Sequence, residues 1–247
     1  KKLYGDDPEI IISNGQSAVV GASDKILKPG YDIDSWYTTE WAGVDPANGD
    51  PLWYMTDENE NRVTTNSYSK ASANRVICGS STPDFYGGFS TNLTWRDFDL
   101  SAIFGYSVGG KLYNYMRMEF DSDGAYTDRN QMKLKDGWSR WEKEGDIATH
   151  PLPVYGNKSN SNSTSSRYLE DASYLRLRNL TIGYNIPVKK FISNLRVYAS
   201  GENLFVISGF SGIDPEVPPL NNGKGTGVAT SVYPQTRKFM FGLNITL

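Results

Sequence analysis

Cysteine and histidine are almost absent, because Cys78 and His150 are the only such residues in the chain of 247. A lone cysteine has no partner for a disulfide within the chain, and a zinc site of the Cys/His type needs several of these ligands. The sequence therefore excludes an internal disulfide framework and a Cys/His metal centre. We expect no metal site and no cofactor.

Long apolar runs and an excess of charge are also lacking. No run approaches the roughly 20 residues of a transmembrane helix, and the first ten residues, KKLYGDDPEI, lack the apolar centre of a signal peptide. Basic and acidic residues number 25 and 28, so nothing points to a nucleic-acid partner. These patterns exclude a helical membrane protein and leave a membrane β-barrel open.

Aromatic residues, at 13% of the chain, and 24 glycines are plentiful instead. The final stretch, KFMFGLNITL (238–247), places an apolar residue at every second position up to its last residue. This period of two predicts a β-strand with one apolar face. The same pattern recurs at 85–96, 97–107, 173–187 and 194–205. Each segment has about the 9–11 residues that a tilted strand needs to cross a bilayer.

The connections between these five segments differ greatly in length. Arg96-Asp97 and residues 187–194 form short turns, whereas 107–173 and 206–234 are long. Short turns at one end and long loops at the other are typical of outer-membrane barrels. We therefore predict an all-β fold, the C-terminal strands of a transmembrane antiparallel β-barrel with long extracellular loops. Five strands cannot close a barrel, so the chain is expected to belong to a larger one.

The predicted division places an extracellular loop region at 1–84 and the last five barrel strands at 85–247. Within the first part, the turn signals of DPANGD (45–50) join 35–44 to 51–55 and predict a β-hairpin. The stretch 130–145 predicts a short amphipathic helix broken at Gly137. The polar, low-complexity stretch 156–167 predicts a mobile loop, and the glycine-rich stretch 221–227 a flexible one.

Catalytic signals are weak, and we predict that the chain is not an enzyme. His150 lies in ATHPLP, a proline-bounded loop without a nucleophile elbow, and is expected to be solvated. Acidic pairs such as Asp121 and Asp123 are expected to be solvated loop charges. The stretch DSDGAYTD (121–128) has part of the calcium-loop rhythm, but Met132 stands where an EF-hand has its bidentate glutamate.

Several stretches together resemble the C-terminal end of SusC/RagA-type TonB-dependent transporters. They are EWAGVDPANGDPLWY (40–54), GSSTPDFYGGFSTNLTWRDFDLSAIFGYSVGGKLYN (79–114), SSRYLEDASYLRLRNLTIGYNIP (165–187), LRVYASGENLF (195–205) and FGLNITL (241–247). The resemblance implies a bacterial outer-membrane barrel of about 22 strands, with a plug domain and a TonB box that this chain lacks. It also implies import of oligosaccharides or peptides together with a SusD-like surface lipoprotein, driven through TonB.

The resemblance also directs attention to particular residues. Aromatic side chains of the outer loops can stack on sugars or anchor partners. We predict substrate binding by Tyr113, Asn114, Tyr115, Trp53 and Tyr54. We predict contact with the lipoprotein lid by Trp138 and Trp141, which would share a face of the predicted helix. Packing of each aromatic residue within its own loop is the competing interpretation.

The end of the chain resembles the signal read by the barrel-assembly machinery, a glycine followed by apolar residues. Gly242, Ile245 and Leu247 fit this signal, whereas Leu247 replaces the usual terminal aromatic residue and Met240 a usual polar one. Two other hypotheses remain open from the residues alone. The first is a passive, porin-like or structural outer-membrane barrel, and the second is a soluble β-sandwich that binds carbohydrate.

Overall fold

The computed structural model of the protein describes residues 10–12, 24–188, 192–217, 227–230 and 233–246. These fall into two compact units. One, called the sheet unit here, consists of 83–109, 172–215 and 233–247. The other, called the loop unit, consists of 1–82, 110–171 and 216–232. Among the described residues, no helix is both long and apolar enough to span a membrane.

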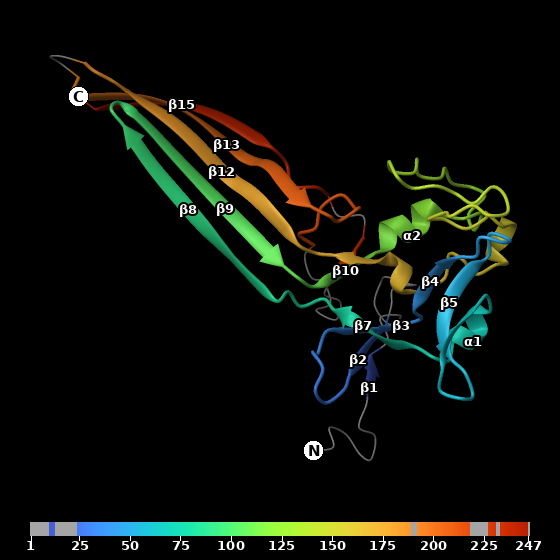
Figure 1. Ribbon diagram of the computed structural model, residues 1–247. Coiled ribbons are helices and arrows are strands. Elements are labelled where there is room, and N and C mark those ends of the chain that lie inside the picture. The colour runs from blue at the N-terminus through green and yellow to red at the C-terminus, as the bar shows by residue number, and fades with distance from the viewer. Residues whose placement is uncertain (1–9, 13–23, 189–191, 218–226, 231–232, 247) are drawn as a thin grey trace. The chain divides into compact units, whose positions relative to one another are not determined.

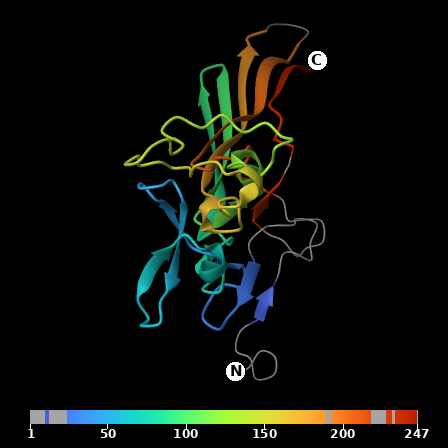
Figure 2. The same cartoon turned by 90° about the vertical axis from the view of Figure 1, so that its right-hand side faces the viewer.

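The sheet unit is a single antiparallel sheet of five long strands lying side by side (Figures 1 and 2). In spatial order they are β15 (Lys238–Thr246), β13 (Asn194–Ser208), β12 (Tyr174–Ile186), β9 (Phe98–Val108) and β8 (Phe85–Trp95). All five predicted strands are confirmed. Leu247 lies outside the described residues, and so do 189–191 of the short turn before β13.

The register of the sheet gathers the apolar residues of all five strands on one face. Phe89 lies opposite Phe104, Ile182 opposite Leu100, and Val197 opposite Leu243. The rings of Phe89 and Phe104 stack at 4.7 Å. A register shift between Leu177 and Asn179 keeps apolar residues on the same face on both sides of the shift. This apolar face is largely exposed, and Phe241 retains 84% of its accessible surface.

The opposite face of the sheet is polar and hydrogen-bonded. Arg196 on β13 reaches across β12 to Asp99 on β9, with nitrogen–oxygen distances of 2.9 and 2.6 Å. Gly183 of β12 lies beneath this ion pair. Nearby, the hydroxyls of Thr181 and Ser200 lie 2.9 Å apart. The sheet is therefore amphipathic across its full width, as the alternation of the sequence predicts.

Replacing Gly183 with alanine should destabilise the sheet by about 1–3 kcal/mol, the usual cost of overpacking. An added Cβ would clash with both Asp99 and Arg196 and break their ion pair. The urea midpoint of the full-length protein in lipid vesicles measures this effect. Gly209→Ala is the matched control, because nothing lies within 4 Å of its Cβ position. Equal midpoints for the two variants would contradict the prediction.

The described part of the loop unit contains three small sheets. The first has the order β1 (Ile10–Ile12), β2 (Asp24–Leu27), β3 (Ser35–Thr38) and β7 (Val76–Ser80). The second has the order β4 (Trp41–Val44), β5 (Pro51–Thr56) and β6 (Arg62–Thr65). The third has the order β11 (Leu169–Asp171), β10 (Lys111–Asn114) and β14 (Val228–Ala229). The predicted hairpin is confirmed as β4–β5, whereas Ser35–Thr38 pairs in a different sheet.

Short helices and a buried cluster complete the loop unit. The helices are α1 (Tyr68–Ser72), α2 (Tyr115–Asp121), and the 3-10 helices η2 (Tyr155–Asn157) and η3 (Ser166–Tyr168). The core consists of Trp36, Tyr113, Met118, Tyr168 and Val228. These residues come from widely separated parts of the chain, so the long loops fold together as a packed structure.

The structure contradicts two predictions about the loops. Residues 130–145 form no helix, because the backbone groups of Ser139 and Trp141 hydrogen-bond to the backbone of His150 instead of forming helical turns. The low-complexity stretch 156–167, predicted to be a mobile loop, instead packs into the loop unit. Its Ser161 and Ser165 are fully buried. Of the glycine-rich stretch 221–227, all but Gly227 lies outside the described residues.

Candidate functional site

The side chains predicted to bind substrate at the start of the long loop are mostly core residues. Tyr113 is fully buried, and its ring lies 6.1 Å from those of both Trp36 and Tyr168. Asn114 is buried too, and its side chain caps α2 by accepting a hydrogen bond from the backbone nitrogen of Arg117 at 3.0 Å. Direct contact with a substrate does not fit this burial. Tyr115, by contrast, is half-buried.

The two residues predicted to bind substrate on β5, Trp53 and Tyr54, also differ in burial. Trp53 is fully buried, and its ring meets those of Trp41 at 5.9 Å and Tyr68 at 5.3 Å, both nearly edge-on. Tyr54 points to the other side of the strand and is half-buried, with the guanidinium of Arg62 3.6 Å from its ring centre. Of these two aromatic residues, only Tyr54 keeps an accessible ring face.

The two tryptophans predicted to contact the lid are held in place within the loop unit. Trp138 packs against His150 at 5.1 Å, and the guanidinium of Arg117 lies 4.4 Å from its ring centre. The Trp141 indole donates a hydrogen bond of 3.0 Å to the carbonyl of Pro46. Both side chains are half-buried. They therefore fix the 134–147 stretch while keeping part of their surface accessible.

Residues that were predicted to be solvated form a buried ionic cluster instead. Asp121, Asp123 and His150 are all fully buried, so the prediction of solvated loop residues is wrong for each. His150 Nε2 lies 3.1 Å from Asp121 Oδ2, and its Nδ1 lies 2.9 Å from the Thr149 hydroxyl. Both ring nitrogens of His150 are therefore hydrogen-bonded. A buried histidine in this position has no access to a substrate.

Three arginines neutralise the two aspartates. Arg117 donates to Asp121 at 3.0 Å, Arg140 donates to Asp123 at 2.8 Å, and Arg167 forms a short ion pair with Asp123. Burial by itself raises the pKa of Asp121, but the hydrogen bond from His150 and the charges of Arg117 and Arg167 outweigh it. The result is a pKa below the usual 3.8. Asp121 is therefore held ionised by the charged groups around it inside the loop unit.

Few local signals in the sequence indicate this cluster. Arg117 and Asp121 are spaced i, i+4 on α2, a weak local signal, whereas Arg140 and Arg167 approach only through folding. Within the described ranges, no group of three or more His, Cys, Asp or Glu side chains is placed to hold a metal ion. The carboxylates of DSDGAYTD instead face arginine and histidine. We interpret the cluster as the structural centre of the loop unit.

Acid should open the loop unit through this cluster. Because the pKa of Asp121 is depressed by folding, its contribution to stability is present above pH 3.8, the unfolded value, and is lost as the pH falls through the folded value. Limited proteolysis of the full-length protein from about pH 6 to about pH 3 should show loop-unit cleavage rising at the acid end. Asp121→Asn should flatten this pH profile, and an unchanged profile would contradict the assignment.

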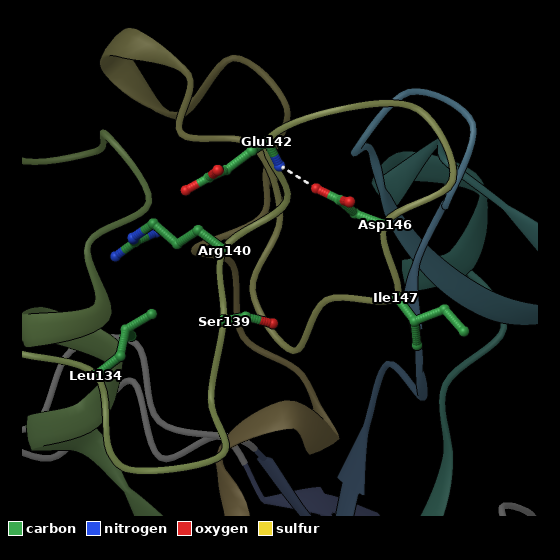
Figure 3. A pocket seen from close by; sticks show the side chains of 6 residues that line it. All are labelled: Leu134, Ser139, Arg140, Glu142, Asp146 and Ile147. Carbon is green, nitrogen blue, oxygen red and sulfur yellow. Dashed lines mark hydrogen bonds between the residues drawn. The ribbon is translucent and has the colours of Figure 1, made fainter.

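The 134–147 stretch forms an open pocket of about 560 Å³ (Figure 3). Leu134 and Ile147 provide apolar walls, and Glu142 and Asp146 provide carboxylates. Asp146 fixes the turn by accepting hydrogen bonds from the backbone nitrogens of Glu142 at 3.1 Å and Lys143 at 3.0 Å. A hydrogen-bonded turn therefore fixes one side of the pocket, on the same stretch that carries Trp138 and Trp141.

Comparison with known proteins identifies the relatives of this chain. No protein-family model matches it. It is 30% identical over 97% of its length to TonB-dependent receptor P3 of Formosa agariphila, covering 25% of that protein. It is 26% identical over 99% of its length to TonB-dependent receptor SusC of Bacteroides thetaiotaomicron, covering 23%. The solved structure of the RagAB peptide transporter superimposes over 98% of the chain with a TM-score of 0.75 and 28% identity.

The chain belongs to the SusC/RagA-type TonB-dependent receptors. The resemblance carried by its strand and loop sequences is thereby confirmed. The chain spans about a quarter of the length of these SusC/RagA-type relatives, since it covers 25% of receptor P3 and 25% of the RagAB chain. Its five-stranded sheet and packed loop unit thus correspond to part of a larger receptor fold.

Proposed function

We propose that this SusC/RagA-type chain forms barrel wall and outer vestibule of a transporter that imports oligosaccharides or peptides across the bacterial outer membrane. Import is driven through TonB, and a SusD-like surface lipoprotein is the partner that closes the vestibule. The relatives named above are receptors and a transporter, which favours transport over catalysis. The burial of His150, the one histidine, also argues against a catalytic role.

The observation that carries this proposal is the continuous apolar face of the five-stranded sheet. A soluble protein rarely leaves so large an apolar surface uncovered, and lipid is the solvent that suits it. The two edge strands, β8 and β15, each pair with one neighbour among the described strands. Because unpaired strand edges in lipid are costly, further strands of the receptor would pair with them and close the barrel.

The role proposed for each predicted site residue depends on how exposed its side chain is. Tyr54 and Tyr115 keep accessible surface and are proposed to face substrate, while the buried Tyr113, Asn114 and Trp53 support them from the core. Trp138 and Trp141 are proposed to contact the lipoprotein, next to the open pocket. A separate set, Gly242, Ile245 and Leu247, is proposed as the barrel-assembly signal.

Uptake by cells that express the full-length protein tests the proposal. Labelled oligosaccharide and peptide mixtures are supplied with and without a protonophore, and the location of the protein is determined by membrane fractionation. We expect the protein in the outer membrane and uptake that stops when the proton gradient collapses. Uptake that continues without the gradient would favour the passive barrel, and a protein soluble without detergent would favour the β-sandwich.

A further inference from the structure

A cavity of about 340 Å³ opens in the loop unit, and its described lining shares no residue with the pocket of Figure 3 or with the residues proposed above. Its walls come from the end of β3, from α1 and the residues after it, and from the stretch before η3. The described lining consists of Tyr37, Tyr68, Arg75 and four small hydroxyl side chains. All of these residues belong to the loop unit.

One wall of the cavity is held rigidly by α1. The Tyr68 hydroxyl donates a hydrogen bond of 2.7 Å to the carbonyl of Thr164, which also lines the cavity. The Tyr68 ring packs on the buried Trp53 at 5.3 Å. Ser72 lies four residues further along α1 and so shares its face with Tyr68. This wall is therefore in place before any ligand arrives.

The other wall is formed by β3 and the residue that follows it. Tyr37 pairs with Ile77 of β7, and the guanidinium of Arg75 lies 4.8 Å from the Tyr37 ring centre. Thr38 and Thr39 are each 1% exposed. The carbonyl of Thr39 accepts a hydrogen bond of 2.9 Å from the backbone nitrogen of Ser166. These contacts join the two sides of the cavity.

The chemistry of the lining favours a sugar over a peptide side chain. Serine, threonine and tyrosine hydroxyls both donate and accept hydrogen bonds, as the hydroxyls of a sugar do. Aromatic rings offer apolar faces to the C–H faces of a sugar ring. The described lining includes no carboxylate for a basic side chain and no aliphatic side chain for an apolar one, and the cation of the described lining, Arg75, lies over the Tyr37 ring. The volume lies at the small end of the roughly 300–1,000 Å³ of ligand sites.

We propose that this cavity is a binding site for one sugar residue of an oligosaccharide. A tyrosine ring, from Tyr37 or Tyr68, packs against the sugar ring, and the half-buried Ser72 and Thr164 offer their hydroxyls to the sugar hydroxyls, whereas the buried Thr38 and Thr39 only support the wall. The inference rests on the proposed function, in which the loop unit faces incoming substrate. It goes further by naming a carbohydrate subsite and the residues that form it.

Saturation-transfer NMR on the purified full-length protein in detergent tests this site. The probes are free glucose, galactose, mannose and xylose, with trialanine as the peptide probe. We expect transfer to at least one of the sugars. Ser72→Phe fills the cavity and should abolish it, whereas Ser69→Phe makes the same change at an exposed position of α1 outside the lining. Tyr37→Leu should weaken binding about tenfold, the upper end of an aromatic contact.

The outcomes separate this inference from the proposed function. The carbohydrate site would be overturned if none of the four sugars shows saturation transfer. It would also be overturned if transfer is equal in the wild type and in Ser72→Phe. Transfer to trialanine alone, lost in Ser72→Phe, would overturn it in favour of a peptide site. Gradient-dependent uptake and outer-membrane location are measured independently in cells. The proposed transport function can therefore be confirmed even if the carbohydrate site is contradicted.

Discussion

Replacing Arg167 with methionine should destabilise the loop unit by about 3–5 kcal/mol, the cost of breaking a buried ion pair by removing one partner. The methionine would keep much of the apolar volume but leave Asp123 without its short ion pair. It would also remove a cation that lies 3.7 Å from Asp121. Both carboxylates are fully buried, so water cannot replace the lost charge.

Hydrogen exchange of the full-length protein measures this loss of stability. Amides of the loop unit should exchange at least about a hundredfold faster in Arg167→Met. Arg129→Met is the matched control, because Arg129 pairs with Glu119 at 3.0 Å while its own side chain is 46% exposed. An exposed pair of this kind contributes about 0–1 kcal/mol. Equal acceleration in the two variants would show that the buried cluster is not the centre of the loop unit.

Replacing Phe89 with arginine should prevent much of the protein from assembling in the outer membrane. Phe89 lies in the middle of β8 on the apolar face, stacked on Phe104. An arginine on the lipid face near the bilayer midplane costs about 2–4 kcal/mol. The assembled fraction is measured by the different gel mobility of folded and heated protein in membrane fractions.

Ser90 provides the matched control for this prediction. It is the next residue of the same strand, exposed like Phe89, and its side chain lies on the polar face. Because successive side chains of a strand point to opposite faces, Ser90→Arg adds the same charge on the polar face of the sheet. We expect near-normal assembly of Ser90→Arg. Equal loss in both variants would mean that the apolar face does not contact lipid.

The strands could be predicted because their signal is local. Alternation over ten or so neighbouring residues reveals one apolar and one polar face, as in 238–246 and 98–108. The β4–β5 hairpin was predictable for the same reason, since DPANGD carries its own turn chemistry. The register shift beside Arg178 was not, because it depends on how β12 fits between β9 and β13. That shift keeps Leu175 and Leu177 on the apolar face.

The interior of the loop unit could not be predicted, because its contacts join residues far apart in the sequence. Tyr113 was predicted to bind substrate and His150 to be exposed to solvent, yet both are buried among residues from other segments. No local pattern indicates that Arg167 pairs with Asp123, or that Tyr37, Tyr68 and Thr164 surround one cavity. Polar composition predicted a mobile loop at 156–167, where hydrogen bonds and ion pairs hold buried side chains instead.

The sequence by itself therefore determined the amphipathic strands, their order of turns and loops, and the family to which they belong. The strands follow from local sequence, because the two-residue period of a strand sorts side chains between two faces. The family follows from the resemblance of the strand and loop sequences to those of known members. Only the tertiary structure decided which aromatic residues remain accessible and which charges are buried in pairs. Burial depends on contacts between segments that come together only on folding. The local sequence of a single strand or loop does not predict these contacts.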